Sequence, residues 1–438
     1  MMASSSTLFT LEGRGLKLDS AADVEAHIAD LRANDVEEVR LLGNTLGVEA
    51  CKVLGEVLAT KKNLKVANFA DIFTGRLLSE IPEALSSLLT SVLNHPNLHT
   101  VNLNDNAFGL NTQAPLVAFL SAHVPLQHLH LNNNGLGPHA GILVADALTE
   151  LHAKKEAARK EGKQVPDLET VICGRNRLEN GSMTAWAKMY TLHHKIKVIK
   201  MVQNGIRQEG ISHLLSEGLH QAHELEILDL QDNTFTLMGG KALAKVVPNW
   251  SVVRELGIGD SLLSAKGGLL LAEALSQGKN QKLETLRLQF NDITALGVKS
   301  LASAAQDSLP ALKRIELNGN KFTEDDESII ALQNLLDERR ENSAGDEADE
   351  EWGVDSLSDL EDLSSDEDED EDEDEDGDEE DEDEEGEKDE DQEDEGVTAE
   401  ERAEKLIKEA EEAQEEPVVQ VTDKAVDDLA AQLGKTQI

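Results

Sequence analysis

A short leucine-rich phrase recurs along most of this 438-residue chain and restricts the fold more than any other feature. The phrase reads leucine, two variable residues and two alternating apolar positions, and most copies add an asparagine. Ten copies begin at Val36, Leu64, Leu98, Leu126, Leu168, Ile196, Leu225, Val253, Leu283 and Leu312, mostly 28 to 30 residues apart. Such regular spacing is typical of a solenoid, in which each unit buries its apolar face against the next.

Each unit divides into a strand and a helix. The apolar residues of the phrase alternate with polar ones, which predicts a short strand with one buried face. The second half of a unit, such as "AKGGLLLAEALSQ" from Ala265, has apolar residues three and four positions apart and predicts a helix. The fold class is therefore α/β. We expect a leucine-rich-repeat solenoid, a ribonuclease-inhibitor-like horseshoe with parallel strands inside and helices outside.

The asparagine of the phrase has a structural explanation. Its amide can bond backbone groups where the chain turns out of the strand, and stacked copies would form a ladder. The residues expected in this ladder are Asn106, Asn134, Asn176, Asn204, Asn233, Asn291 and Asn320.

Two units are longer than the rest. From Leu64 to Leu98 is 34 residues, and the extra six fall near "FTGRLLSEI", where the repeat asparagine is missing and Arg76 occurs. From Leu126 to Leu168 is 42 residues, and the added segment reads as a lengthened, charged helix followed by a loop.

Charge divides the chain into three regions. The net charge is −47, and residues 346–395 contain 35 Asp/Glu and one Lys. Such a block repels itself and predicts disorder. We assign residues 1–343 to the repeat domain with its caps, 344–396 to an acidic disordered segment, and 397–438 to a short, partly helical C-terminal segment. The acidity argues against nucleic acid or a membrane as partner. Two cysteines and no apolar secretory run favour a reducing compartment, and we expect a monomer.

A column of polar residues precedes the repeat asparagine, at the carboxyl edge where the strands end. It contains Gly43, Asp71, Asp105, Asn133, Arg175, Gln203, Asp232, Asp260, Phe290 and Gly319, with Asn132 beside it. Exposed loops at one edge are where repeat proteins bind partners. A merely solvated edge is the alternative interpretation. His128 and His130 share a strand face but lack carboxylate or cysteine partners, so no metal site is expected.

Several linking phrases resemble one family. "FADIFTGR", "LHTVNLNDNAFG", "LNNNGLGPHAG" and "ICGRNRLENGSMTAWAK", together with the acidic stretch, resemble the GTPase-activating proteins of the nuclear-transport GTPase Ran. The resemblance covers nearly the whole repeat region. The short C-terminal segment is similar to the fungal type, without the folded C-terminal domain of the animal proteins.

The resemblance implies a GTPase activator that is not itself an enzyme. It would bind GTP-loaded Ran along one edge of the horseshoe, with a Ran-binding protein as a further candidate partner, in the cytoplasm and at the nuclear periphery. The partner would hold GTP and Mg²⁺, so this chain needs no cofactor. The family arginine falls on Arg76 and the asparagine beside the GTPase's glutamine on Asn133. That glutamine is ordered without an arginine finger.

Other residues and functions stay open at this point. Asp71, Asp105, Asn132, Arg175 and Asp232 are candidate partner contacts. Arg76 has the alternative of pairing with Asp71 or Asp105 and only ordering the edge. A histone-binding or scaffold protein also combines leucine-rich repeats with an acidic tail. A ribonuclease-inhibitor-like binder shares the unit length, although that type is cysteine-rich.

Overall fold

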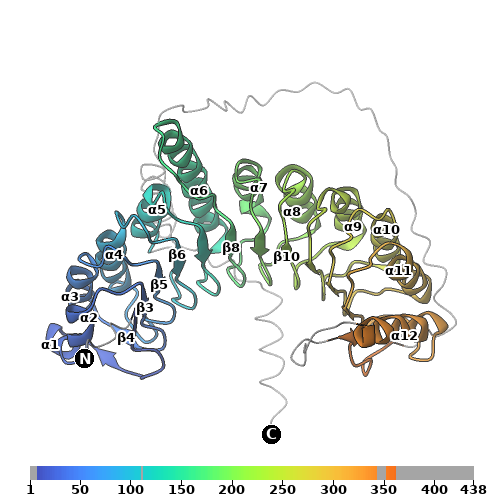
Figure 1. Ribbon diagram of the computed structural model, residues 1–438, viewed down its shortest axis with the longest axis horizontal. Helices are drawn as coiled ribbons and strands as arrows, with labels where there is room; N and C mark the ends of the chain where they lie inside the picture. The colour runs from blue at the N-terminus through green and yellow to red at the C-terminus, as the bar shows by residue number, and fades with distance from the viewer. Residues whose placement is uncertain (1–6, 110–111, 343–351, 362–438) are drawn as a thin grey trace, which may run out of the picture.

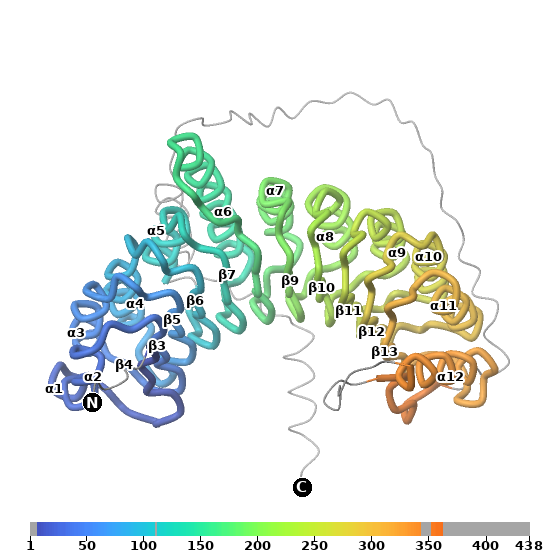
Figure 2. Tube along the Cα trace, in the orientation of Figure 1, coloured from blue at the N-terminus to red at the C-terminus, as the bar shows by residue number. Residues whose placement is uncertain are grey.

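A computed structural model describes residues 7–109, 112–342 and 352–361, and these ranges form a curved solenoid (Figure 1). Strands line the inner, concave side of the curve, and helices cover the outer side (Figures 1 and 2). The predicted α/β leucine-rich-repeat horseshoe is confirmed. Both cysteines are buried and unpaired.

One parallel sheet runs the length of the solenoid. Its order is that of the chain, β1-β3-β5-β6-β7-β8-β9-β10-β11-β12-β13-β14. The bounds are β1 (Leu8–Thr10), β3 (Glu38–Arg40), β5 (Val66–Asn68), β6 (Thr100–Asn102), β7 (His128–His130), β8 (Thr170–Ile172), β9 (Val198–Lys200), β10 (Ile227–Asp229), β11 (Glu255–Gly257), β12 (Thr285–Arg287), β13 (Arg314–Glu316) and β14 (Gly353–Val354). The middle residue of each repeat strand, such as Leu129, is fully buried, and its neighbours face the concave surface. A small sheet pairs β2 (Lys17–Leu18) with β4 (Thr45–Leu46).

The helices follow the predicted positions. They are α1 (Ala21–Glu25), α2 (Ala29–Ala33), α3 (Val48–Leu58), α4 (Ile81–Val92), α5 (Gln113–Ala122), α6 (Gly137–Lys160), α7 (Met183–Leu192), α8 (Gln208–His213), α9 (Thr236–Val246), α10 (Ala265–Leu275), α11 (Ala295–Asp307) and α12 (Glu327–Asn342). Two short 3-10 helices are η1 (Asn180–Ser182) and η3 (Val247–Asn249), and the π-helix η2 (Leu214–Leu219) follows α8 directly. Helix α6 has 24 residues and projects beyond its neighbours in Figure 1, so the predicted long helix is confirmed.

The asparagine ladder forms as predicted. The side-chain oxygen of Asn134 accepts from the backbone N–H of Asn106 at 3.0 Å, and Asn176 accepts likewise from Asn134 at 3.0 Å. Each amide also donates to carbonyl groups of its own strand and the preceding one; Asn134 reaches Leu103 and Leu131. These residues are buried. The ladder therefore satisfies backbone groups that would otherwise be left unpaired inside the solenoid.

A second set of side-chain contacts joins the helices of adjacent repeats. In several repeats one polar side chain, from a helix or from the residues after it, reaches a backbone carbonyl of the preceding helix. His95 bonds the carbonyl of Leu58 at 2.9 Å, and His193 bonds that of Leu148 at 2.8 Å. Trp250 donates to Leu219 and Arg339 to Ala305 in the same way. Each contact joins a side chain of one repeat to the backbone of the repeat before it, so the contacts tie adjacent repeats together.

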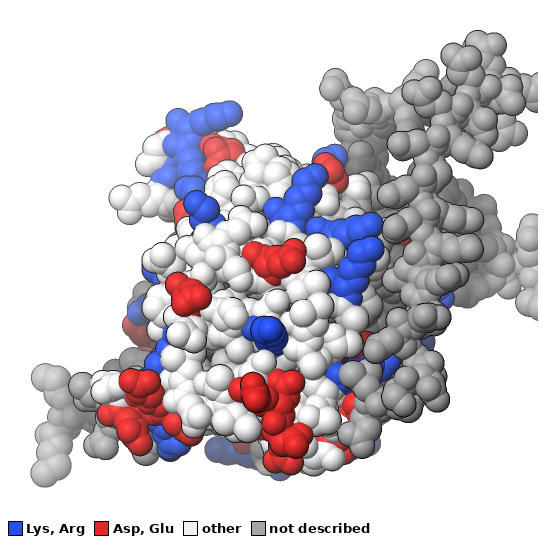
Figure 3. Space-filling model, turned by 90° about the vertical axis from the view of Figure 1, so that its right-hand side faces the viewer, with Lys and Arg blue, Asp and Glu red and all other residues white. Residues whose placement is uncertain are grey.

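The C-terminal end extends further than the sequence predicted. Helix α12 packs Ile329, Leu332 and Leu336 over the last repeat and caps it. Figure 3 shows charged side chains of both signs on this end face, as a solvent-exposed cap requires. Strand β14 then pairs with β13, and Asp355 accepts from the backbone N–H of Leu317 and Asn318 at 2.7 and 3.1 Å.

The boundary of the repeat domain at residue 343 is corrected by this strand. Residues 352–361 were assigned to the acidic segment, but they add to the sheet because Val354 continues its apolar layer and Asp355 caps exposed N–H groups. The remainder of that segment and all of 397–438 lie outside the described residues.

Candidate functional site

The polar column at the carboxyl edge of the strands has one repeated backbone geometry. Its residues all have positive φ, from 45° at Asp71 through 55° at Asn133 to 75° at Gly43. From Gly43 to Phe290, each backbone N–H donates to a carbonyl of the following repeat; for Asn133 this is Gly174 at 2.9 Å. The left-handed conformation favours glycine, asparagine and aspartate, which explains much of the column's composition. The turn directs each side chain out of the solenoid, and we call this row of side chains the rim.

Asn133 is exposed on the rim, whereas its neighbour Asn134 is buried in the ladder. The side-chain Nδ2 of Asn133 donates to Oδ1 of Asp105, one repeat earlier, at 2.9 Å. A carboxylate only accepts, so Asp105 requires the NH₂ end of the amide to face it. The carbonyl end of Asn133 is thereby directed away, and within the described ranges it makes no hydrogen bond. It is available to a donor from outside.

Two other predicted contact residues are already engaged within the protein. Asn132 is half-buried, and its side-chain oxygen accepts from the backbone N–H of Gly174 at 2.5 Å. Asp71 accepts from the hydroxyl of Thr74 at 2.6 Å, which fixes the start of the inserted loop. Asn132 lies in the same repeat as Asn133, and Asp71 lies two repeats earlier.

Arg76 does not point toward Asn133. Its guanidinium forms an ion pair with Asp19, which follows β2, and donates to the backbone carbonyls of Thr45 at 3.0 Å and Leu18 at 3.4 Å. The alternative pairing with Asp71 or Asp105 does not form, because the inserted loop turns toward the N-terminal end, where β2 and β4 offer these acceptors. The side chain is only 10% exposed. These contacts join the inserted loop to the N-terminal strands, through a partner, Asp19, that the sequence analysis did not name.

The remaining candidates lie further along the rim. Arg175 is exposed and forms no ion pair with a described residue. Asp232 is exposed beside Asp260; partial burial, with the neighbouring Asp260 carboxyl as a further cause, raises the pKa of Asp232 above its usual range. The structure thus brings Asp71, Asp105 and Asn133 together on successive repeats and sets Asp232 on the other half of the arc.

Asp19 is the functional candidate that the sequence analysis missed. It lies 57 residues before Arg76 and outside every repeat, so no periodicity connects the two. The Arg76 hydrogen bond lowers the pKa of the Asp19 carboxyl below its usual range. Only the capping signal "SAADVE", which begins with Ser20 as a helix cap, indicated that a folded segment starts here.

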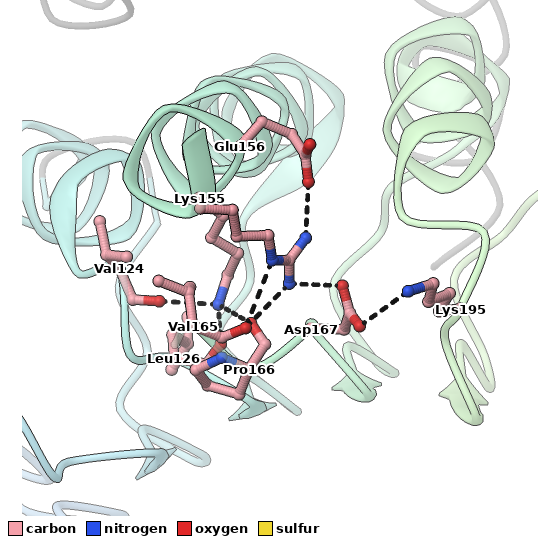
Figure 4. A network of polar contacts seen from close by, with 9 residues as sticks. Val124, Leu126, Lys155, Glu156, Val165, Pro166, Asp167 and Lys195 are labelled. Carbon is pink, nitrogen blue, oxygen red and sulfur yellow. Dashed lines mark hydrogen bonds and ion pairs between the residues drawn. The ribbon is translucent and has the colours of Figure 1, made fainter. Parts of the chain in front are cut away.

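A cavity of about 290 Å³ lies away from the rim, between the end of α6 and the loop after α7. Its polar side chains are already paired (Figure 4): Arg159 contacts Glu156 and Asp167, and Lys195 contacts Asp167. Beside it, Lys155 donates to the carbonyls of Val124, Leu126 and Pro166, although burial lowers its pKa to about 7. This network holds the lengthened helix α6 against the loop that follows it.

The residues that the structure describes contain no group of three or more His, Cys, Asp or Glu side chains placed to hold a metal. They also contain no helix with the length and apolar character needed to cross a membrane.

Comparisons with known proteins agree with this architecture. A family model described as Leucine Rich repeat matches residues 222–244 and 279–302. Ran GTPase-activating protein 1 of Saccharomyces cerevisiae is 38% identical over 340 residues, covering 76% of this chain and 82% of that protein. Ran GTPase-activating protein 1 of Xenopus laevis is 41% identical over 201 residues, covering 45% of this chain and 34% of that protein. A ribonuclease inhibitor of Sus scrofa is 26% identical over 308 residues, covering 68% and 61%.

The repeats, the ladder and the exposed polar rim define a horseshoe-shaped leucine-rich-repeat protein. With 38% identity extending over 76% of its length, the chain belongs to the Ran GTPase-activating protein family.

Proposed function

We propose that this protein binds GTP-loaded Ran and stimulates its GTP hydrolysis, in support of nucleocytoplasmic transport. Membership of the family supports the activity. The observation that carries the site is Asn133, an exposed amide on a rigid turn whose orientation is fixed by Asp105. Such an amide can hold another amide in one geometry, because it offers a donor and an acceptor on a short side chain.

The proposed mechanism orders a glutamine that belongs to the GTPase. GTP hydrolysis is slow because the attacking water and the developing charge are poorly organised. The free carbonyl of Asn133 would accept from the glutamine amide and hold that side chain against the water. Fixing reacting groups in one orientation lowers the entropy cost of reaching the transition state. No arginine finger is needed in this scheme, which agrees with the internal contacts of Arg76.

The hydrolytic site in this proposal lies in the partner, which also binds GTP and Mg²⁺, so the chain carries no cofactor of its own. We further propose that it acts as a monomer in the cytoplasm and at the nuclear periphery, without contacting nucleic acid or membrane. A Ran-binding protein is a candidate third component. The net charge of −47 supports a basic protein surface as partner over phosphate-rich ones.

The test is phosphate release from several purified small GTPases, each loaded with GTP, with and without this protein. We expect strong acceleration with Ran and none with the others. Equal, low release from every GTPase would contradict the proposed function.

A further inference from the structure

The inserted loop between β5 and α4 exposes two adjacent leucines. Leu77 is 67% exposed and Leu78 is 56% exposed. The other large apolar side chains exposed in the described residues are Met238, Leu262, Phe290, Leu296 and Ile330, and none of these is adjacent to another in the sequence. Exposed apolar groups that gather at one place mark a contact surface more often than scattered ones do.

The inserted loop is anchored to the core of the solenoid. Ile72 and Phe73 are buried in the core, and the backbone N–H of Leu46 donates to the carbonyl of Ile72 at 2.9 Å. Within the loop, the N–H of Arg76 donates to Phe73 and that of Glu80 to Leu77, each at 3.0 Å. Leu77 and Leu78 therefore lie on a hydrogen-bonded turn that is anchored to the core, and their exposure is a property of that turn.

The Arg76 side chain makes the strongest of the contacts that anchor the loop. One side chain joins the loop to Asp19, to the carbonyl of Leu18 and to the carbonyl of Thr45. The Nε of Arg76 is buried without a hydrogen-bond partner, so the two terminal nitrogens of the guanidinium make all of these contacts. Hydrogen bonds between charged groups are stronger than neutral ones.

The loop is continuous with the part of the rim that contains Asn133. Thr74 in the loop contacts Asp71. The backbone N–H of Asp71 donates to Asn104, and that of Asp105 donates to Asn132, each at 2.9 Å. A surface that covers Asn133 and continues toward the N-terminal end of the rim meets the acidic side chains first and then the two leucines.

We propose that Leu77 and Leu78 form an apolar contact for the GTP-loaded GTPase, and that the Asp19–Arg76 pair is the latch that positions this contact. The proposal rests on the function proposed above. In this proposal Arg76 and Asp19 are positioning residues. The loop contributes affinity for the partner, whereas Asn133 acts on the hydrolytic step. The matching surface on the GTPase is an apolar patch beside its catalytic glutamine.

The expected effects separate affinity from catalysis. Removing either leucine should raise KM for the GTP-loaded GTPase by about 5- to 30-fold with kcat unchanged, the loss that follows from one buried apolar side chain. Asp19→Ala and Arg76→Ala should each raise KM, and the double variant should be no worse than the more severe single one, because both remove the same latch.

The experiment measures kcat and KM for Leu77→Ser, Leu78→Ser, Asp19→Ala, Arg76→Ala and the double variant, with thermal unfolding to verify folding. Ile330→Ser, on α12, is the matched control for losing an exposed apolar side chain, and Arg32→Ala, in the N-terminal cap, is the control for losing a cap arginine. Both controls should resemble the wild type.

Two outcomes would overturn the inference. One is wild-type KM in both leucine variants. The other is a loss of kcat in Arg76→Ala that Asp19→Ala does not share, since the guanidinium would then act on the partner itself. If Arg76→Ala fails to fold, the variants at the exposed residues Asp19, Leu77 and Leu78 still test the inference. Absence of activation by the wild-type protein would refute the proposed function instead.

Discussion

Asp105 and Asn133 lie on successive repeats and share one hydrogen bond of 2.9 Å, from the amide of the second to the carboxylate of the first. This bond sets which end of the Asn133 amide faces outward. The repeat places Asp105 and Asn133 one strand apart, within hydrogen-bonding reach. Their bond leaves the Asn133 carbonyl facing outward as an acceptor.

Asp105→Ala removes the group that orients Asn133. We expect kcat for GTPase activation to fall by about 5-fold, the equivalent of one net hydrogen bond of about 1 kcal/mol. Asp105→Asn should retain most activity, because its side-chain oxygen still accepts. Steady-state kinetics of both variants checks this. Equal activity in Asp105→Ala and the wild type would show that the orientation of Asn133 does not depend on this contact.

Asn133→Ala removes the proposed catalytic contact itself. We expect kcat to fall by about 100-fold or more, the range seen when one oriented transition-state donor or acceptor is lost. Stability should fall by only about 1 kcal/mol, because the side chain is exposed but alanine tolerates the left-handed turn less well than asparagine. Single-turnover hydrolysis and urea unfolding measure the two effects. Normal hydrolysis by this variant would remove Asn133 from the mechanism.

Asn134→Ala, one residue further on, should behave in the opposite way. Its amide donates to Leu103 and Leu131 and accepts from Asn106, all within the buried ladder. Leaving these backbone groups unpaired should lower the free energy of unfolding by about 2–4 kcal/mol. Urea unfolding is the measurement, and a loss no larger than that of Asn133→Ala would contradict the structural role of the ladder.

His193 should make stability depend on pH. Burial lowers its pKa to about 4, so the folded protein keeps the ring neutral while the unfolded chain binds a proton below about 6.5. The unfolded state therefore gains stability as pH falls from 6.5 toward 4, and at pH 5 the cost to the fold is about 2 kcal/mol. His193→Gln can still donate to Leu148 but does not titrate. Its unfolding free energy should fall less between pH 7 and pH 5 than that of the wild type; parallel losses would contradict this assignment.

Asp355→Ala tests the terminal strand. The carboxylate accepts from the N–H groups of Leu317 and Asn318, and its loss should destabilise the C-terminal end by about 1–3 kcal/mol. Hydrogen exchange at these two amides should accelerate, whereas exchange near β5 should not change. Asp355→Asn, which keeps one acceptor oxygen, is the control. Unchanged protection in Asp355→Ala would mean that β14 holds without this cap.

The repeat phrase predicted most of the fold because its physical requirements are local. A buried Leu129, a ladder Asn134 and a turn residue Asn133 each follow from their place in the unit. Spacing alone distinguished the exposed asparagine from the buried one beside it. The same reasoning located the insertion near "FTGRLLSEI", in the loop between β5 and α4.

Contacts outside the repeat could not be predicted in this way. Asp19 meets Arg76 only because β2 and β4 fold beside the inserted loop, and no pattern joins residues 57 positions apart. Strand β14 was missed because its few apolar residues lie in an acidic segment, where composition favours disorder. The orientation of the Asn133 amide required knowing that Asp105 stands next to it.

Because the same turn recurs at the rim in each repeat, the number of repeats between two rim side chains sets the distance between them. Parallel strands lie about 4.8 Å apart, so the loop at Asp71 and the amide of Asn133 are separated by two such steps. Removing or adding one whole unit between them would preserve the core, yet it would shift the apolar contact against the amide by a full step. The partner's surface must have the same intervals, and the number of repeats between two functional side chains is therefore itself under constraint.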